Sequence, residues 1–144
     1  MIVFVGIQFI PTTPNQQEDL LQSNFMNSYK VPQEIQQVLK NSCFDCHSNN
    51  TNYPWYNRIQ PISWFLEQHI KKGKNDLNFD EFESYSIRKQ KNKLKSIANQ
   101  IEENKMPLFS YTLIHKNSKL TEVEKVKLID WLYKKQDSIN NNIK

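Results

Sequence analysis

Two cysteines and a histidine stand together in a chain that has only two cysteines and three histidines. Cys43 and Cys46 are three positions apart, and His47 follows directly. On a helical turn both thiols lie on one face, from which they can add to the two vinyl groups of one haem, while the imidazole is directed at the iron. Random placement gives this C-x-x-C-H pattern in roughly three of ten thousand such chains. It therefore predicts one covalently attached haem c per chain.

Three other uses of these residues stay open. A redox-active C-x-x-C pair needs a thioredoxin-like strand–helix–strand setting, and no such strands are visible in the sequence. A zinc site needs four ligands and would have to recruit His69 or His115, because there is no second C-x-x-C pair. A structural disulfide between Cys43 and Cys46 is the third alternative, in an exported chain. Haem attachment is the favoured interpretation.

The second axial ligand decides what such a haem can do. Met106 follows a predicted helix, and Pro107 is expected to stop that helix so that the thioether points inward. Met106 could also be a flexible core filler. The alternative ligands are His69, on the apolar face of a predicted helix, and His115, in a loop; their plainer interpretations are a hydrogen-bonded core histidine and a solvated one. We expect His47 and Met106 to ligate the iron, which leaves no open site for a substrate and suits electron transfer.

The elements that position these residues are expected to be helices, because no segment alternates for long with the period of a strand. Pro32 fits the first turn of the first helix, and Gly73 fits the end of the second. Thr121 and Glu124 match a capping box that opens the last helix. Four helices are expected, at residues 32–42, 63–72 and 86–104 and from residue 121 onward. The loop 49–61 and the second helix carry four aromatic residues that are expected to wall the haem, although core packing explains each one singly: Tyr53, Trp55, Tyr56 and Trp64.

Composition narrows the function further. With 144 residues the chain fits one domain, and its net charge of +4 is mild. Its only two glycines leave no phosphate-binding loop. The basic run 88–95 either docks an acidic partner or is the solvated face of a helix. Because no aromatic residues interleave with this run, nucleic acid binding has little support.

The first ten residues form the one strongly apolar run, about half as long as a membrane span. No Lys or Arg precedes it, unlike in complete export signals. We interpret residues 1–10 as the remnant of an export signal or membrane anchor whose true start lies upstream; the alternative is a short buried strand or helix. Residues 11–30 are expected to be a flexible tether, 31–136 the domain, and 137–144 a disordered tail.

From Cys43 to about Leu132 the chain resembles the bacterial haem-binding domain family, small C-x-x-C-H proteins of the cell envelope. The matching stretches are residues 43–49, 53–56, 61–64 with His69 and Ile70, 77–79, 106–108 with Tyr111 and His115, and 120–121 with 131–132. The last stretch also looks like the C-terminal helix of class I cytochromes c. The sequence departs from the family at Lys72, since an acidic residue usually precedes the glycine there.

The resemblance implies haem ligation, an envelope location and electron transfer. Together with the motif, it predicts an all-α, cytochrome c-like domain around one covalent haem, on the periplasmic side of the membrane. The protein is expected to exchange electrons with a redox partner and not to be an enzyme. The rival prediction is a peroxidase-like enzyme or a gas or redox sensor with an open distal position. The sequence indicates no oligomeric state.

Overall fold

The computed structural model describes residues 2–16 and 24–141. This part of the chain is built from helices, with one isolated β-bridge between Gln16 and Asn50, so the all-α prediction is confirmed. The α-helices are α1 (Ile2–Ile7), α2 (Asn24–Ser28), α3 (Gln33–Ser42), α4 (Phe44–His47), α5 (Ile62–Asp76), α6 (Ile87–Glu102), α7 (Phe109–Ile114) and α8 (Glu122–Asn141). Three 3-10 turns join them: η1 (Trp55–Arg58), η2 (Phe82–Ser84) and η3 (Lys116–Ser118).

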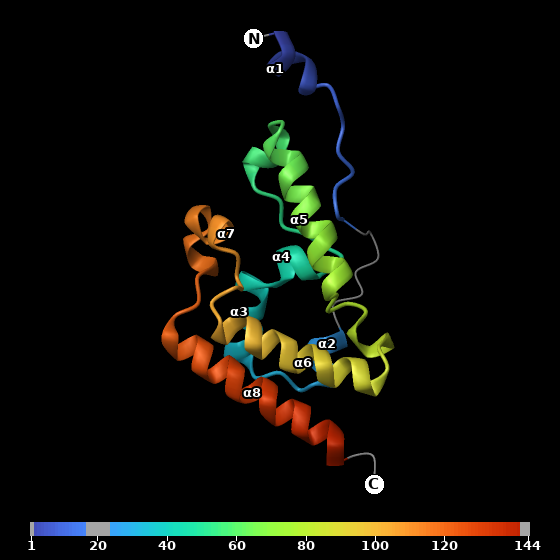
Figure 1. The fold of residues 1–144 in the computed structure, drawn as a ribbon, viewed down its shortest axis with the longest axis vertical. Coiled ribbons are helices and arrows are strands. Elements are labelled where there is room, and N and C mark those ends of the chain that lie inside the picture. Colours follow the sequence, from blue (N-terminus) through green and yellow to red (C-terminus); the bar gives the residue numbers. More distant parts are fainter. Residues whose placement is uncertain (1, 17–23, 142–144) are drawn as a thin grey trace.

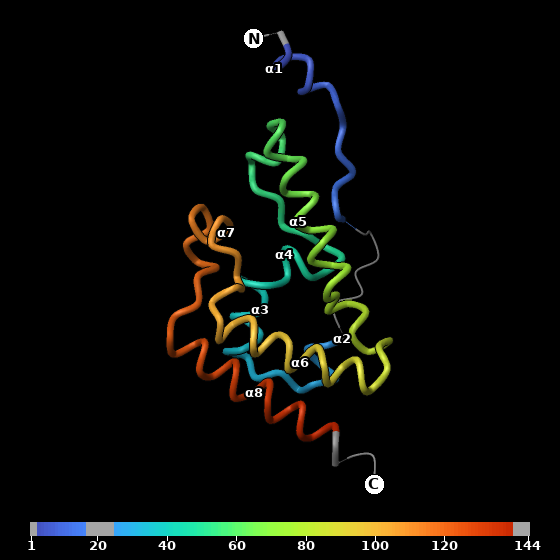
Figure 2. Tube along the Cα trace, viewed as in Figure 1, coloured from blue at the N-terminus to red at the C-terminus, as the bar shows by residue number. Residues whose placement is uncertain are grey.

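The four expected helices correspond to α3, α5, α6 and α8, and the other four are short. Figure 1 shows α4 near the middle of the molecule, between α5 on one side and α7 on the other. α6 and α8 lie side by side at the end opposite α1, as the trace in Figure 2 also shows. The predicted domain is therefore a helical body in which short helices bring distant segments to α4.

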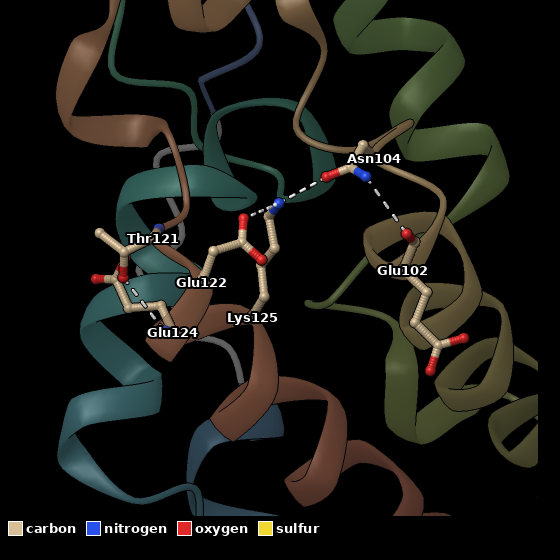
Figure 3. A network of polar contacts seen from close by, with 6 residues as sticks. All are labelled: Glu102, Asn104, Thr121, Glu122, Glu124 and Lys125. Carbon is tan, nitrogen blue, oxygen red and sulfur yellow. Dashed lines mark hydrogen bonds and ion pairs between the residues drawn. The ribbon is translucent and has the colours of Figure 1, made fainter.

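The core lies where α3, α6 and α8 meet. α3 and α6 present the apolar stripes that their sequence periods predict. In α8 the expected stripe is wrong in its first turns, because Val123 and Val126 are exposed and the helix faces the core through other residues. The buried members are Ile35, Val38 and Leu39 of α3, Leu94, Ala98 and Ile101 of α6, and Leu128, Trp131 and Leu132 of α8. The capping box that opens α8 is confirmed, because the Thr121 N–H donates to the Glu124 carboxylate (2.8 Å) and the Glu124 N–H donates to Thr121 Oγ1 (3.2 Å; Figure 3).

Two details of the helix ends differ from the expectation. Pro32 stands before the first turn of α3, in an extended conformation (φ −57°, ψ 145°). Gly73 does not end α5, which continues to Asp76. Gly73 has a different role, since it permits a close contact between α5 and α4.

The expected tether is wrong where the structure describes it. Phe25, in α2, is fully buried and packs against Phe79 and Phe82, with ring centroids 4.9 Å from each. The side chain of Asn15 donates to the Ser48 carbonyl and to Thr51 Oγ1, at 2.9 Å each. Residues 17–23 lie outside the described residues. The N-terminal segment is thus held against the body at both of its described parts.

The described residues at both ends of the chain form helices. α1 exposes the apolar side chains of Val3, Phe4 and Val5; Val3 is 77% exposed. Among the described residues, none of the helices combines the length and the apolar character that crossing a membrane requires. α8 runs on to Asn141, so residues 137–141 of the expected disordered tail are helical, and 142–144 lie outside the described residues.

Candidate functional site

The C-x-x-C-H motif is a direct continuation of α3. The Cys43 N–H donates to the Leu39 carbonyl (2.9 Å) and the His47 N–H donates to the Cys43 carbonyl (3.0 Å), so the motif itself forms the helical turn α4. Cys43, Cys46 and His47 all line one open cavity of about 450 Å³. Met106, which is distant from the motif in the sequence, lines the same cavity. The structure thus brings the four predicted site residues together.

The imidazole of His47 is oriented by two backbone carbonyls. Its Nδ1 lies 2.9 Å from the Gly73 oxygen and 3.0 Å from the Leu77 oxygen. Because carbonyls only accept hydrogen bonds, Nδ1 carries the proton and Nε2 keeps a free lone pair. Burial lowers the pKa of His47, although the two carbonyls oppose this, so the neutral ring is favoured. A neutral ring fixed through Nδ1 is the form in which histidine ligates a metal.

Gly73 permits this arrangement by having no side chain. A Cβ at Gly73 would lie 2.7 Å from the Cys46 carbonyl oxygen and 3.3 Å from the Cys46 Cβ. Real Cβ atoms essentially never approach backbone oxygen so closely, so α5 can contact α4 here only through glycine. The same residue therefore sets the distance between the two helices and supplies one of the His47 acceptors.

A polar brace fixes the segment after α5 to the end of the motif. The Phe79 N–H donates to the His47 carbonyl (2.8 Å), and the Asn49 N–H donates to the Asp80 carboxylate (2.6 Å). The side chain of Asn78, only 2% exposed, donates to Asn49 Oδ1 (2.8 Å). This brace holds the Leu77 carbonyl in place for His47.

The two cysteines are free thiols and form no disulfide with one another. Burial and, to a smaller extent, the neighbouring Cys46 together raise the pKa of Cys43 to about 12. Burial and, to a smaller extent, Asp45 together raise the pKa of Cys46 to about 11. A redox-active pair needs the opposite shift, a lowered pKa that populates the thiolate. Within the described residues, groups of three or more Cys, His, Asp or Glu that could hold a metal ion are absent, so the zinc alternative lacks its ligand set.

Met106 is placed by the way α6 ends. Asn104 adopts a left-handed conformation (φ 54°), and the N–H groups of Lys105 and Met106 donate to the Gln100 carbonyl at 2.9 and 3.1 Å. The Asn104 N–H donates to the Ile101 carbonyl (3.0 Å), which completes a Schellman motif. The expectation that Pro107 stops the helix is wrong, because Asn104 has already reversed the chain.

The same turn is tied to the start of α8. Asn104 Oδ1 accepts from Lys125 Nζ (2.6 Å), and Lys125 pairs with Glu122 (2.7 Å), as Figure 3 shows. The Asn104 amide also donates to the Glu102 carbonyl, at 3.5 Å. The backbone position of Met106 thus depends on contacts between α6 and α8.

The two alternative histidines differ in position. His69 lines the cavity but is exposed, so the prediction that it lies on a buried apolar face is wrong. His115 is only partly exposed and lies outside the residues that line the cavity. Its Nε2 is 2.5 Å from the Tyr56 hydroxyl, and its ring stacks on Tyr111 at 4.3 Å. Of the three candidates for a second ligand, Met106 and His69 line the cavity and His115 does not.

Sequence reasoning missed a contact between α7 and the motif. The Tyr111 hydroxyl donates to the Asp45 carboxylate (2.5 Å), and Tyr111 also lines the cavity. Burial and the hydrogen bond to Asp45 raise the pKa of Tyr111. Asp45 is one of the two unspecified residues in C-x-x-C-H, so the pattern gave no indication of this role.

The expected aromatic wall is also wrong. Tyr53, Trp55, Tyr56 and Trp64 do not line this cavity, and Trp55 is 79% exposed. The cavity walls are instead apolar residues from α5 onward: Leu77, Phe79, Ile97, Ile101, Met106, Pro107, Leu108, Tyr111 and Leu120. Its polar lining includes Lys72, Asp76, Lys93, Ser96 and Gln100. Apolar walls with two thiols, an oriented imidazole and a thioether fit a haem.

Comparison with known proteins gives one match. A family model described as a haem-binding domain matches residues 2–134. The match includes the N-terminal segment that the structure packs against the body. No curated protein and no solved structure matches the chain significantly.

Proposed function

Since the chain belongs to the haem-binding domain family, and is therefore a haem-binding protein, we propose that it holds one haem c covalently through Cys43 and Cys46, with His47 as the proximal ligand. The observation that supports this most is the orientation of His47. Nδ1 donates to both backbone carbonyls, which leaves Nε2 to ligate the iron. Two free thiols line the same cavity as this ring. Each thiol would form a thioether by adding its S–H across a vinyl group of the haem.

Met106 is the proposed distal ligand, and the proposed activity is one-electron transfer. When bound, the haem would supply an Fe(III)/Fe(II) couple, and ligation by histidine and methionine would raise its reduction potential. His47 and Met106 would hold the iron, and Leu77, Ile97 and Leu108, which line the cavity, would exclude water from the group. Ligation by both residues would leave no open position for a substrate, which suits electron transfer better than catalysis.

A second candidate function rests on His69. Because its exposed side chain lines the same cavity, an open distal position beside a histidine would suit a peroxidase-like enzyme or a gas or redox sensor. This candidate gains support only if Met106 does not bind the iron.

The proposed location is the periplasmic side of the cytoplasmic membrane, with residues 2–10 as the anchor. Its support is the exposed apolar surface of α1 and the bacterial attachment of haem c outside the cytoplasm. Fractionation of cells should find the haem protein in the membrane pellet, released by detergent and not by salt. The haem protein in the soluble cytoplasmic fraction would contradict the proposed location.

The proposed partner is a redox protein with an acidic surface. In the basic run, Lys93 donates to the Asp76 carbonyl, and Lys89 lies over the Tyr85 ring (3.5 Å). Arg88 and Lys95 are exposed on the outer face of α6 and are available to a partner. Electron exchange with such a partner should slow as the salt concentration rises.

Changing both cysteines tests covalent attachment. Cys43→Ala together with Cys46→Ala should abolish haem staining on a denaturing gel, since no thioether can form. The single variants should retain haem through one bond. Asn41→Ala, an exposed position near the motif and outside the residues that line the cavity, is the control that should stain like the wild type. Haem retained by the double variant under denaturing conditions would contradict the proposal.

A further inference from the structure

One end of the molecule has almost no charge. The chain has 19 Lys and Arg and 15 Asp and Glu, yet residues 2–12 and 53–66 together contain a single one of these, Arg58. We call these two segments the apolar end. They comprise α1 with the residues that follow it, η1, and the first turn of α5. Figure 1 shows α1 and the start of α5 at the same end of the molecule, opposite α6 and α8.

The apolar end exposes large hydrophobic side chains from both segments. From the first segment these are Val3 (77% exposed), Phe4 (54%), Val5 (55%), Phe9 (82%) and Ile10 (50%). From the second they are Trp55 (79%), Ile62 (44%) and Phe65 (61%). An exposed apolar surface of this kind normally contacts a partner or a membrane.

Hydrogen bonds join the two segments. The Gln8 amide donates to the Gln60 carbonyl (3.0 Å), and the Gln60 N–H donates back to Gln8 Oε1 (2.9 Å). The Gln60 amide also donates to the Ile10 carbonyl (3.2 Å), and the Thr12 and Ser63 hydroxyls are 3.1 Å apart. If α1 enters a bilayer, these bonds bring η1 and the start of α5 to the bilayer surface.

We infer that the apolar end, and not only the N-terminal segment, docks the protein on a lipid bilayer through Trp55, Ile62 and Phe65. This inference deepens the proposed membrane location and does not depend on the haem. Tryptophan is enriched at membrane interfaces, where its ring is amphipathic, and a lone exposed arginine fits the phosphate layer. A bilayer is the favoured occupant because the surface is continuous with the proposed anchor.

Docking through the apolar end would set the distance between the haem site and the bilayer. The axis of α5 leads from Ile62, at the apolar end, to Gly73, at the cavity. Eleven residues of helix correspond to about 16 Å at 1.5 Å per residue. The haem would therefore lie within about one helix length of the bilayer, while the basic run on α6 lies toward the opposite end (Figure 1).

Vesicle sedimentation of the full chain tests the inference. The wild-type protein should sediment with phosphatidylcholine vesicles, which are zwitterionic and have no net charge, at both low and high salt. Trp55→Ser with Phe65→Ser should weaken this partitioning roughly tenfold, because two large apolar side chains no longer enter the lipid. The matched control is Phe109→Ser with Leu113→Ser, which removes side chains of similar exposure (77% and 60%) from α7 and should leave partitioning unchanged.

Several results would overturn the inference. They are no partitioning by the wild type, equal partitioning by the Trp55 and Phe65 variant, and equal loss in the α7 control. Sedimentation without vesicles would indicate self-association instead, and binding only to phosphatidylglycerol vesicles at low salt would indicate binding through the basic run.

The variant Phe4→Ser with Phe9→Ser separates the contact of the N-terminal segment from that of Trp55, Ile62 and Phe65. If only this variant loses binding, residues 2–10 anchor the protein alone, and the proposed location holds while the inference is wrong. Helical circular dichroism verifies the fold of each variant, and the single change Trp55→Ser repeats the test should the pair fail to fold.

Discussion

At the scale of single residues, the site depends on a histidine whose two ring nitrogens have different tasks. His47 Nδ1 is committed to the Gly73 and Leu77 carbonyls, so only Nε2 is available to a metal. The motif indicated the two thiols and the imidazole because all three lie within five consecutive residues. The acceptors for Nδ1 lie 26 and 30 residues later, where no local pattern could indicate them.

Gly73→Ala tests the close approach of α5 to α4. The new Cβ would meet the Cys46 carbonyl oxygen at 2.7 Å, so one helix must move. We expect the free energy of unfolding to fall by about 1–3 kcal/mol, measured by urea denaturation. Gly6→Ala is the control, because a Cβ there has nothing within 4 Å, and it should change stability little. Equal stability of the two variants would show that α5 and α4 do not touch at Gly73.

Met106→Ala tests the distal ligand. The oxidised wild-type protein should show the weak near-infrared charge-transfer band of His/Met haem, and the variant should lose it because the Fe–S bond is gone. His69→Ala, which changes another residue of the cavity lining, is the matched control and should keep the band. If Met106→Ala leaves the spectrum unchanged while His69→Ala alters it, the distal ligand is His69.

At the scale of elements, long periodic helices followed from the sequence and short ones did not. α3 and α6 have ten and sixteen residues and carry apolar stripes, and the capping box of α8 is complete within four residues. α2 and α7 have five and six residues, fewer than two turns, so they show no period. α7 nevertheless carries Tyr111, whose hydroxyl donates to Asp45, a contact across 66 positions of sequence.

The residue that ends α6, Asn104, allows a prediction about stability. Its left-handed conformation (φ 54°) ends α6 and places Met106. Asn104→Ala should reduce the free energy of unfolding by about 1–2 kcal/mol, since an ordinary side chain is strained there. Asn104→Gly keeps the permitted conformation and is the control; it should be distinctly more stable than the alanine variant even though it also loses the bond to Lys125. Denaturant midpoints measure both, and a glycine variant no more stable than the alanine variant would count against the helix end described.

At the scale of the whole molecule, the N-terminal segment is part of the domain. The family match from residue 2 and the burial of Phe25 agree on this. The sequence pointed to a tether because its few large apolar residues, such as Phe25 and Met26, lie among Asn, Gln and Ser and form no periodic stripe. The ring partners of Phe25, which are Phe79, Phe82 and Trp131, become its neighbours only after the chain has folded.

Phe25→Ala measures this contribution. Removal of a fully buried ring leaves a cavity, so the free energy of unfolding should fall by about 3–5 kcal/mol. Phe9→Ala removes a ring that is 82% exposed and should change stability by less than about 0.5 kcal/mol. Thermal or urea unfolding compares the two. If Phe25→Ala lowered the free energy of unfolding as little as the control does, residues 24–28 would contribute no more to stability than a tether.

Covalent haem attachment is tested most directly by the intact mass of the chain, matured in a host with a haem-attachment system and then denatured. Thioether formation adds each S–H across a vinyl group and loses no atoms. The expected mass is therefore that of the chain plus one whole haem, with both thiols unavailable to alkylation. The unmodified chain mass with two alkylated cysteines, from a preparation in which a control c-type cytochrome has matured, would contradict covalent attachment at Cys43 and Cys46.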